Sequence, residues 1–278
     1  MFKDKTIAFV GAGAMGEAMI RGLLSQKIVA PDQIVAADPW HERIEELQKK
    51  YGIKGTNENR VAAEAGQIVV LSIKPQTLPY VMPELRGHLR RQDLLLSIVA
   101  GVPIKKLADG TAHAAVVRAM PNTPAQIGQG ISVWTGTDEV SQEHKAQAQS
   151  VLGSFGEEIY VDQEDYLDMA TALSGSGPGY AFLMMEALID AGVHLGFSRR
   201  IAEQLVFQTM RGSVEYAMQS GKHVAELRNQ VTSPGGTTAA ALYHMEKGGL
   251  RTVISRGIWA AYQRSKGLGT GESDHGPE

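Results

Sequence analysis

A glycine-rich turn near the N-terminus constrains the fold of this chain more than any other feature. Gly11-Ala12-Gly13-Ala14-Met15-Gly16 directly follows the apolar run 6–10, which is typical of a buried strand, and opens the amphipathic run 14–26, which is typical of a helix. A strand, a GxGxxG turn and a helix in this order predict a βαβ unit that binds a dinucleotide. Asp38 lies about 20 residues further on, at the end of a second apolar run, 34–37, where an acidic residue binds ribose hydroxyls.

The glycines and the acidic residue have distinct physical tasks in such a unit. Gly11 permits a tight turn, Gly13 lets the backbone approach a pyrophosphate, and Gly16 lets the helix pack closely on the strand. The start of the helix supplies N–H groups and a partial positive charge to the phosphates. Asp38 can accept hydrogen bonds from both ribose hydroxyls of NADH and would repel a 2′-phosphate, although it could also cap the helix that begins near Trp40.

The choice between NADH and NADPH stays open from the sequence. His41 and Arg43 follow Asp38 closely enough to accommodate the phosphate of NADPH. The expected cofactor is therefore NADH or NADPH, with NADH slightly favoured. A structural turn that binds no ligand is the alternative interpretation of the glycine motif.

Apolar and amphipathic runs alternate over the first part of the chain, and helical runs alone follow. Continuous apolar runs, as in parallel strands that are covered on both faces, occur at 67–73, 94–99 and 115–117, and short strands are expected at 132–134 and 159–161. This alternation predicts a doubly wound α/β domain over 1–162. Residues 163–266 predict an all-helical domain, with helices at 164–172, 178–196, 199–219, 222–230, 235–247 and 250–266. The stretch 267–278 has no apolar periodicity and is expected to be a disordered tail.

Composition excludes several classes of protein. The 278 residues carry a net charge of −3, which gives no field to attract nucleic acid or an anionic membrane. The absence of cysteine excludes disulfides, thiolate catalysis and cysteine-based zinc sites, and the eight histidines show no metal-ligand spacing, so no metal is expected. No apolar run approaches the ~20 residues that span a bilayer, and the N-terminus does not resemble a signal peptide. A soluble, cytoplasmic protein is the expectation.

The helical run at 180–195 predicts self-association. It is apolar on nearly every face, as in helices that are buried on all sides. The second domain is too small to bury such a helix within its own core. We therefore expect a homodimer in which a second subunit completes this core, and burial against the first domain alone is the alternative.

A turn near the end of the chain is the best candidate for a substrate site. In the segment 231–238 (VTSPGGTT), the Ser-Pro pair predicts an N-cap and a first helical residue. Gly235 and Gly236 then fall in the first helical turn, where each costs about 1 kcal/mol relative to alanine. Glycines leave N–H groups open to an anion that the helix dipole attracts. We expect a carboxylate pocket with the hydroxyls of Thr237 and Thr238 at its edge, and an ordinary capped helix is the alternative.

Three further segments carry less specific signals. Ser72-Ile73-Lys74-Pro75-Gln76 follows an expected strand, at the edge where open α/β sheets bind ligands. Met120-Pro121-Asn122-Thr123-Pro124-Ala125 is stiffened by two prolines, and is either a loop beside a nicotinamide or a structural turn. Leu173–Tyr180 (LSGSGPGY) opens the apolar helix with small residues, which favours close helix packing, with close approach of a ligand as the alternative.

Taken together, these motifs resemble pyrroline-5-carboxylate reductase. GAGAMG, SIKPQ, VAGV, MPNTPA, LSGSGP and VTSPGGTT occur in the family's order between about residues 5 and 266. The resemblance implies a Rossmann domain followed by an all-α dimerisation domain that interlocks with a second subunit, and in some members a decamer of five dimers. It also implies the last step of proline biosynthesis, in which L-1-pyrroline-5-carboxylate is reduced to L-proline with NADH or NADPH.

The resemblance further implies roles for individual residues. The cofactor would contact Gly11, Ala12, Gly13, Ala14, Met15, Gly16, Asp38, Asn59, Ser72, Ile73, Lys74, Pro75, Val99, Ala100, Gly101 and Asn122. The substrate would contact Glu164, Gln230, Ser233, Gly235, Gly236, Thr237 and Thr238. Thr238 would be the catalytic residue, with its hydroxyl near the imine nitrogen. A threonine hydroxyl is too weak an acid to do more than orient the protonated imine or relay a proton, so positioning of the two reacting carbons would supply most of the catalysis.

Some positions depart from the family's pattern. Gly179 stands where alanine is usual, Asn229 replaces an aspartate, and Asp38 replaces a small polar residue that many members place around a 2′-phosphate. A β-hydroxyacid dehydrogenase needs a lysine on the first long helix of the second domain, and 176–196 contains none. A reductase of another cyclic imine carboxylate and a catalytically weak dinucleotide-binding paralogue are the remaining alternatives.

Overall fold

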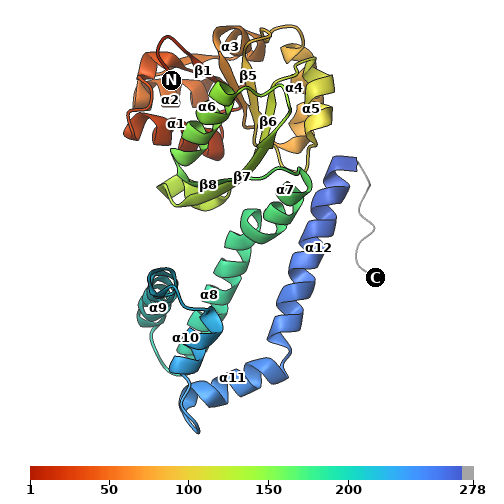
Figure 1. Cartoon of the computed structure of the whole chain (residues 1–278). Helices are drawn as coiled ribbons and strands as arrows, with labels where there is room; N and C mark the ends of the chain where they lie inside the picture. The colour runs from red at the N-terminus through yellow and green to blue at the C-terminus, as the bar shows by residue number, and fades with distance from the viewer. Residues whose placement is uncertain (271–278) are drawn as a thin grey trace. The chain divides into compact units, whose positions relative to one another are not determined.

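The computed structural model describes residues 1–270. The chain divides into two compact units (Figure 1). One contains residues 1–177 together with the end of the last helix, from Ala261, and the other contains Pro178–Ala260. The first unit holds the sheet, and the described part of the second is helical.

An eight-stranded sheet forms the centre of the first unit, in the order β3-β2-β1-β4-β5-β6-β7-β8. Neighbouring strands are parallel except that β7 runs antiparallel to β6. The order reverses between β1 and β4, so the carboxyl ends of these two strands flank the switch point of a doubly wound sheet. The strands are β1 (Ile7–Val10), β2 (Ile34–Ala37), β3 (Lys54–Thr56), β4 (Ile68–Leu71), β5 (Leu94–Ser97), β6 (Val116–Met120), β7 (Gly130–Gly136) and β8 (Gly156–Tyr160).

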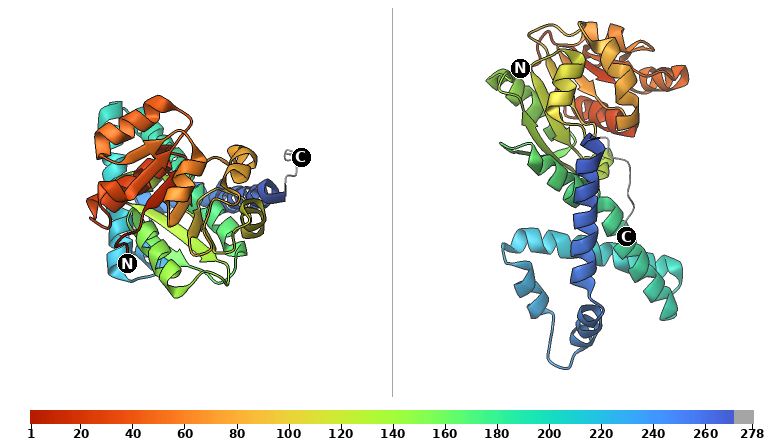
Figure 2. Two further views of the ribbon diagram at one scale, coloured as in Figure 1. Left: turned by 90° about the horizontal axis from the view of Figure 1, so that it is seen from above. Right: turned by 90° about the vertical axis from the view of Figure 1, so that its right-hand side faces the viewer.

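Helices cover both faces of this sheet, as the two views of Figure 2 show. Along β1, Ile7 and Phe9 face one apolar core, and Ala8 and Val10 face the other. The first core is closed by α1 (Ala14–Ser25), α2 (His41–Tyr51) and α6 (Gln142–Gly153), and the second by α3 (Asn59–Ala65), α4 (Leu78–Leu85) and α5 (Ile104–Thr111). Short 3₁₀ helices occupy Pro31–Gln33, Pro75–Thr77 and Thr123–Ile127. Burial on both faces explains why the central strands are continuously apolar.

The predicted doubly wound α/β fold is confirmed, and β3 is the strand that the sequence analysis did not predict. This strand has three residues, one of them Gly55, and it pairs only with β2 at the edge of the sheet. None of its residues is fully buried. Such a strand shows neither an apolar run nor an alternating pattern, because no face of it has to be apolar.

The helical part begins with α7 (Asp165–Ala170), which continues into a π-helical turn, η4 (Thr171–Gly175). It continues with α8 (Gly177–His194), α9 (Arg199–Ser220), α10 (Val224–Gln230), α11 (Thr237–Lys247) and α12 (Leu250–Thr270). All six helices expected after residue 163 are present. The last one, expected to end at 266, continues to Thr270, so the first residues of the predicted tail are helical, and 271–278 lie outside the described residues.

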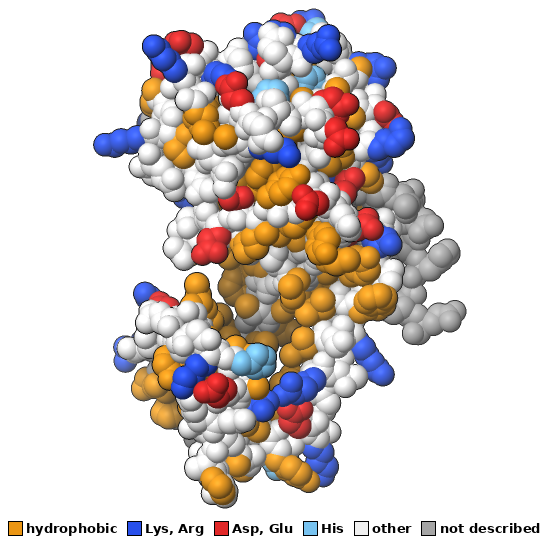
Figure 3. Space-filling model, in the orientation of Figure 1, with side chains coloured by type: hydrophobic (Ala, Val, Ile, Leu, Met, Phe, Trp, Pro, Cys, Tyr) orange, Lys and Arg blue, Asp and Glu red, His pale blue; other side chains and the backbone are white. Residues whose placement is uncertain are grey.

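Helix α8 keeps a large apolar surface exposed within the single chain. Ile189 is its one buried residue in the described structure, whereas Phe182, Leu183 and Met184 are 63%, 65% and 41% exposed. Further apolar side chains lie on the surface of the helical part (Figure 3). A surface of this kind is typical of protein–protein interfaces. Within residues 1–270, no helix combines the length and the apolar character that a membrane crossing requires.

Candidate active site

The glycine motif lies at the switch point of the sheet. Gly11 follows β1 with a φ of +93°, and its N–H donates to the carbonyl of Ala37 at 2.9 Å. A Cβ at Gly11 would lie 2.5 Å from Cγ2 of Ile73, in the loop after β4. The hydroxyl of Ser72 donates to the carbonyl of Gly11 at 2.6 Å. The loops after β1 and β4 are thereby joined, and only glycine fits the first position of the motif.

The start of α1 presents backbone N–H groups at this edge. Gly13 is the N-cap residue, it is exposed, and a Cβ there would meet nothing within 4 Å. Among residues 1–270, no acceptor is found for the N–H groups of Ala14 and Met15, which precede the first helical bond. A Cβ at Gly16 would lie 2.7 Å from the carbonyl oxygen of Gly11, so glycine is needed there for close packing. This arrangement fits a pyrophosphate, as the sequence analysis predicts.

Asp38 is held rigidly at the end of β2. Its Oδ2 accepts the N–H of Ala12 at 3.0 Å, and its Oδ1 accepts the N–H of Trp40 at 3.1 Å. The N-cap of α2 is Trp40, so the alternative in which Asp38 caps this helix is wrong. The carboxylate instead connects the glycine turn to the end of β2, half-buried and beside the position expected for the ribose.

The remaining predicted cofactor residues differ in how far the structure brings them to this edge. Ser72 to Pro75 follow β4, and Val99 to Gly101 follow β5, both at carboxyl ends of parallel strands. Asn59 begins α3, and its amide donates to Glu84 of α4 at 2.8 Å. Asn57, which sequence reasoning missed, lies closer to the acidic residue of β2, because its amide donates to the carbonyl of Asp38 at 2.8 Å. No sequence signal separates these two asparagines.

Asn122 joins two of the motifs that the sequence analysis considered separately. Its Nδ2 donates to the carbonyl of Ser174 at 3.2 Å, and its Oδ1 accepts the N–H of Ile131 at 3.0 Å. A Cβ at Gly175 would lie 2.6 Å from Cε of Met120. The MPNTPA loop therefore packs on the π-helical turn of the LSGSGP segment at Gly175, whereas a Cβ at Gly177 or Gly179 would meet nothing within 4 Å. The Asn122 side chain serves this packing, and contact with a cofactor stays a prediction.

Glu164 belongs to a half-buried ion cluster. Its Oε1 accepts hydrogen bonds from Nη1 of Arg118 and from the N–H of Ile104, both at 2.7 Å. Nη2 of Arg118 donates to Asp168 at 3.0 Å, and the same oxygen of Asp168 accepts from Ser265 at 2.8 Å. The Arg118 side chain, on β6, is 4% exposed. The cluster fixes the start of α5, and with it the loop after β5, to α7 and α12; sequence reasoning missed Arg118, Asp168 and Ser265.

In the second unit, the SPGG segment forms a turn before the helix. The N–H of Gly236 donates to the carbonyl of Ser233 at 3.0 Å, and Gly235 has a φ of +70°. Proline second and a positive φ third are the pattern of a type II turn. The expectation that Ser233 caps the helix and that both glycines lie in its first turn is therefore wrong, because a residue with a φ of +70° cannot be helical. The N-cap is Gly236, and α11 begins at Thr237.

This turn leaves a set of open N–H groups at the start of α11. The first helical bond joins the N–H of Ala240 to the carbonyl of Gly236 at 3.2 Å. Within the part of the chain that the structure describes, the N–H groups of Thr237, Thr238 and Ala239 find no acceptor. Thr238 is half-buried. These three amides, at the start of the helix, are the candidate carboxylate site of this unit.

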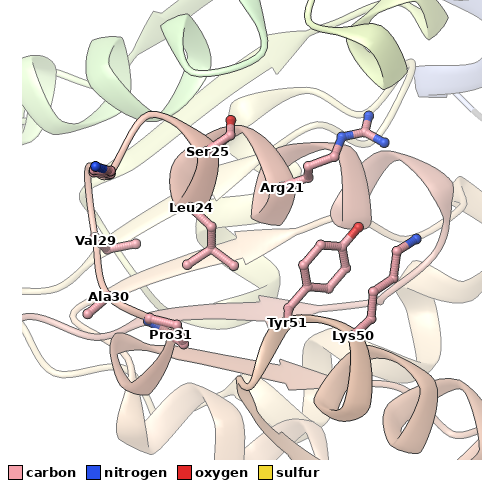
Figure 4. A pocket seen from close by; sticks show the side chains of 9 residues that line it. Arg21, Leu24, Ser25, Val29, Ala30, Pro31, Lys50 and Tyr51 are labelled. Atoms are coloured by element: carbon pink, nitrogen blue, oxygen red, sulfur yellow. The ribbon is translucent and has the colours of Figure 1, made fainter.

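A hollow on the first unit is lined by residues outside these motifs (Figure 4). It is lined by the end of α1, the segment after it and the end of α2, with Arg21, Lys50 and Tyr51 among its residues. None of the predicted site residues lines it. Residues 1–270 contain no cluster of histidine and acidic side chains suited to a metal ion.

Comparison with known proteins identifies the family. A sequence model for pyrroline-5-carboxylate reductase dimerisation matches residues 164–268, and one for NADP oxidoreductase, coenzyme F420-dependent, matches residues 6–101. A pyrroline-5-carboxylate reductase of Synechocystis sp. is 38% identical over 95% of this chain and 98% of its own length. The chain belongs to the pyrroline-5-carboxylate reductase family.

Solved structures of this family have the same fold. The pyrroline-5-carboxylate reductase of Coxiella burnetii is 34% identical, with a TM-score of 0.88 over 95% of this chain and 98% of that one. The pyrroline carboxylate reductase of Plasmodium falciparum, solved with NADP bound, is 32% identical, with a TM-score of 0.87 over 96% and 98%. The predicted family and the predicted Rossmann and dimerisation domains are therefore confirmed, and the chain is an oxidoreductase.

Proposed function

We propose that this enzyme reduces L-1-pyrroline-5-carboxylate to L-proline with NADH or NADPH. The substrate has one carboxylate and one ring imine, so the enzyme needs one anion site, one dinucleotide site and no metal. The observation that carries the proposal is the start of α11, where the turn from Ser233 to Gly236 leaves three consecutive N–H groups open. A carboxylate is the anion that suits them, because the helix dipole adds a partial positive charge at the same place.

The residues of the first unit fit a dinucleotide. Gly13 leaves space at the start of α1, the N–H groups of Ala14 and Met15 are open, and Asp38 stands at the end of β2. When bound, NADH or NADPH supplies the hydride that the ring carbon of the imine accepts. The ring nitrogen takes one proton, so one imine, one reduced cofactor and one proton give one proline and one oxidised cofactor.

The chain's own residues orient the substrate. We propose that the amides of Thr237, Thr238 and Ala239 bind the carboxylate and that the hydroxyl of Thr238 contacts the ring nitrogen. A threonine hydroxyl can hold a protonated imine or pass a proton from water, but it is too weak an acid to protonate the imine by itself. Positioning therefore contributes most of the rate.

Three assignments rest on the resemblance and stay proposals. Glu164 uses Oε1 for Arg118 and Ile104, so a contact with substrate falls to its other oxygen. Gln230, at the end of α10, donates to Glu226 at 3.3 Å and would have to exchange that bond for a substrate contact. Asn59 would have to do the same with Glu84.

We also propose that the working form is a homodimer, either alone or as one of five dimers in a decamer, and that it acts in the cytoplasm. The exposed apolar surface of α8 supports the dimer. The ring of five and the cytoplasmic location come from the resemblance and the proposed reaction.

A direct assay tests the reaction. Purified enzyme is supplied with L-1-pyrroline-5-carboxylate and either NADH or NADPH, and loss of the reduced cofactor and formation of proline are measured together. We expect equal amounts of cofactor consumed and proline formed. Cofactor oxidation without proline, or no turnover with either cofactor by a protein that binds ADP-ribose, contradicts the substrate assignment.

A further inference from the structure

The two basic residues that follow Asp38 in the sequence, His41 and Arg43, contact acidic and amide groups of the same chain. A 2′-phosphate on the adenosine ribose is the one group that distinguishes NADPH from NADH, and enzymes that bind NADPH commonly place an arginine beside it. His41 and Arg43 are the candidates by sequence. The structure shows what each of them contacts.

Arg43 donates from all three of its nitrogens. Its Nε donates to the carbonyl of Ala12 at 2.7 Å, its Nη1 to Glu46 at 2.8 Å, and its Nη2 to Glu17. The side chain is 21% exposed. A phosphate could recruit this guanidinium only if it broke bonds to two carboxylates, one of which, Glu17, is itself mostly buried, with 17% of its side chain exposed.

The carboxylate that holds Arg43 is fully ionised. Glu17 also accepts from Lys50 and from the hydroxyl of Tyr51, both at 2.8 Å. Burial alone would raise the pKa of Glu17, but the hydrogen bonds from Lys50, Arg43 and Tyr51 outweigh it and lower the pKa to about 2. Burial likewise lowers the pKa of Arg43, and its bonds to Glu17 and Glu46 more than compensate. The pair therefore stays charged and joined at neutral pH.

His41 is similarly engaged. Its Nδ1 lies 3.1 Å from Oδ1 of Asn57, and its Nε2 lies 3.1 Å from Glu45. The amide of Asn57 is oriented by its donation to the carbonyl of Asp38 at 2.8 Å. Both ring nitrogens thus face oxygen atoms of the chain, although the ring is exposed.

We infer that the adenosine end of this site selects the free ribose diol of NADH and rejects the 2′-phosphate of NADPH. Asp38, oriented by the N–H groups of Ala12 and Trp40, has free lone pairs that can accept hydrogen bonds from two ribose hydroxyls, whereas a phosphate in their place would meet its carboxylate. Glu17 and Glu46 neutralise the guanidinium of Arg43, and Glu45 lies beside the ring of His41. The inference rests on the proposed use of a nicotinamide cofactor and adds which of the two the chain prefers.

Binding of half-cofactors tests this without the reaction. ADP-ribose and 2′-phospho-ADP-ribose are titrated into the full-length protein and followed by calorimetry. We expect ADP-ribose to bind at least about tenfold more tightly than 2′-phospho-ADP-ribose, because the negative charge of the 2′-phosphate would lie beside that of Asp38. A smaller ratio, or a reversed one, overturns the inference. If the ratio is as expected but pyrroline-5-carboxylate is not reduced, the proposed function fails and this inference stands. If pyrroline-5-carboxylate is reduced but the two half-cofactors bind equally, the proposed function stands and this inference fails.

Two substitutions distinguish the contribution of the Asp38 carboxylate from that of Arg43. Asp38→Asn should weaken ADP-ribose and strengthen its 2′-phosphate, because the repelling charge is gone. Glu17→Gln should release Arg43 and tighten 2′-phospho-ADP-ribose by about tenfold with little change for ADP-ribose. Glu42→Gln is the matched control. Glu42 is an exposed acidic residue on α2, the helix that carries Arg43, and it makes no contact with Arg43 in the described structure. If Glu17→Gln does not fold, Glu46→Gln tests the same release, and unchanged discrimination in both folded variants contradicts the role of the held arginine.

Discussion

Nη1 of Arg118 lies 2.7 Å from Oε1 of Glu164, and that oxygen also accepts the N–H of Ile104 at the start of α5. The contact spans three elements: strand β6 carries the arginine, the segment before α7 carries the glutamate, and α5 follows the loop after β5. A nearly buried guanidinium shared by two carboxylates thus holds one of the predicted cofactor loops in place.

Replacing this arginine should be costly for stability. Arg118→Met would leave Glu164 and Asp168 without their shared cation, and removing one partner of a buried ion pair typically costs about 3–5 kcal/mol. Because the two carboxylates are partly exposed, we expect a loss of about 3 kcal/mol in the free energy of unfolding, measured by chemical denaturation.

The matched control is Lys105→Met, which breaks an exposed pair with Asp109 on α5, where the lysine side chain is 84% exposed. It should cost less than about 1 kcal/mol. Equal losses in the two variants would mean that burial of Arg118 does not matter.

The central elements of this fold were predictable from sequence because their physics is local. β2, β4 and β5 are covered on both faces, so each is a continuous apolar run, and α1 and α2 show helical periodicity. The glycine motif is equally local, since a φ of +93° at Gly11 needs glycine whatever surrounds it. The edge strand β3 gave no such signal, because it is short and not fully buried.

The parts of the site that sequence reasoning missed depend on distant partners. Arg118 and Glu164 are separated by 46 positions, and Arg43 and Glu17 by 26, so no periodicity connects them. The sequence places His41 and Arg43 close enough to Asp38 to accommodate a 2′-phosphate, but it does not show that both side chains already contact groups of the same chain. The start of α11 was misplaced for a local reason: Pro-Gly after serine suits both a capped helix and a type II turn, and the positive φ of Gly235 decides between them.

The open amides at the start of α11 should be sensitive to a side chain at the N-cap. Gly236→Val places a branched group beside them, and its Cβ alone would lie 2.6 Å from Oγ of Ser233. We expect the KM for pyrroline-5-carboxylate to rise at least about tenfold, because the carboxylate loses its access to the helix start. Binding of ADP-ribose should not change, and unimpaired proline formation by this variant contradicts the proposed carboxylate site.

The hydroxyl of Thr238 should affect turnover more than binding. Thr238→Val keeps the shape and the backbone amide but removes the group proposed to contact the ring nitrogen. We expect kcat to fall by about ten- to hundredfold, a modest acid–base contribution, with little change in KM. Thr238→Ser restores a hydroxyl and should recover most of the rate. A serine variant as slow as the valine variant would point to packing of the threonine methyl group instead.

The charged cluster around Glu17 predicts a pH dependence of stability. The pKa of Glu17 is lowered from 4.5 to about 2 in the folded chain, so its contribution is complete above 4.5 and is lost as the pH falls towards 2. At neutral pH, Glu17→Gln should therefore cost roughly 2 kcal/mol of unfolding free energy, a difference that shrinks between pH 4.5 and pH 2. Denaturation of both proteins at several pH values measures this, and Glu42→Gln should show no such trend. If the difference in unfolding free energy between the two proteins stays constant from pH 4.5 to pH 2, it does not come from the ionised form of Glu17.

The apolar surface of α8 predicts the state of assembly. Leu183 is 65% exposed within the single chain, and a leucine at the centre of a subunit interface cannot be replaced by a charge without large loss of affinity. Leu183→Glu should therefore lower the mass of the native particle, measured by light scattering after size-exclusion chromatography, from that of the assembly to that of one chain. Tyr80→Glu is the control, because Tyr80 is an exposed aromatic residue, 76% accessible, on α4 of the sheet-containing unit. The mass of the unchanged protein also distinguishes one dimer from five, and a wild-type particle of a single chain would contradict the proposal that a second subunit covers α8.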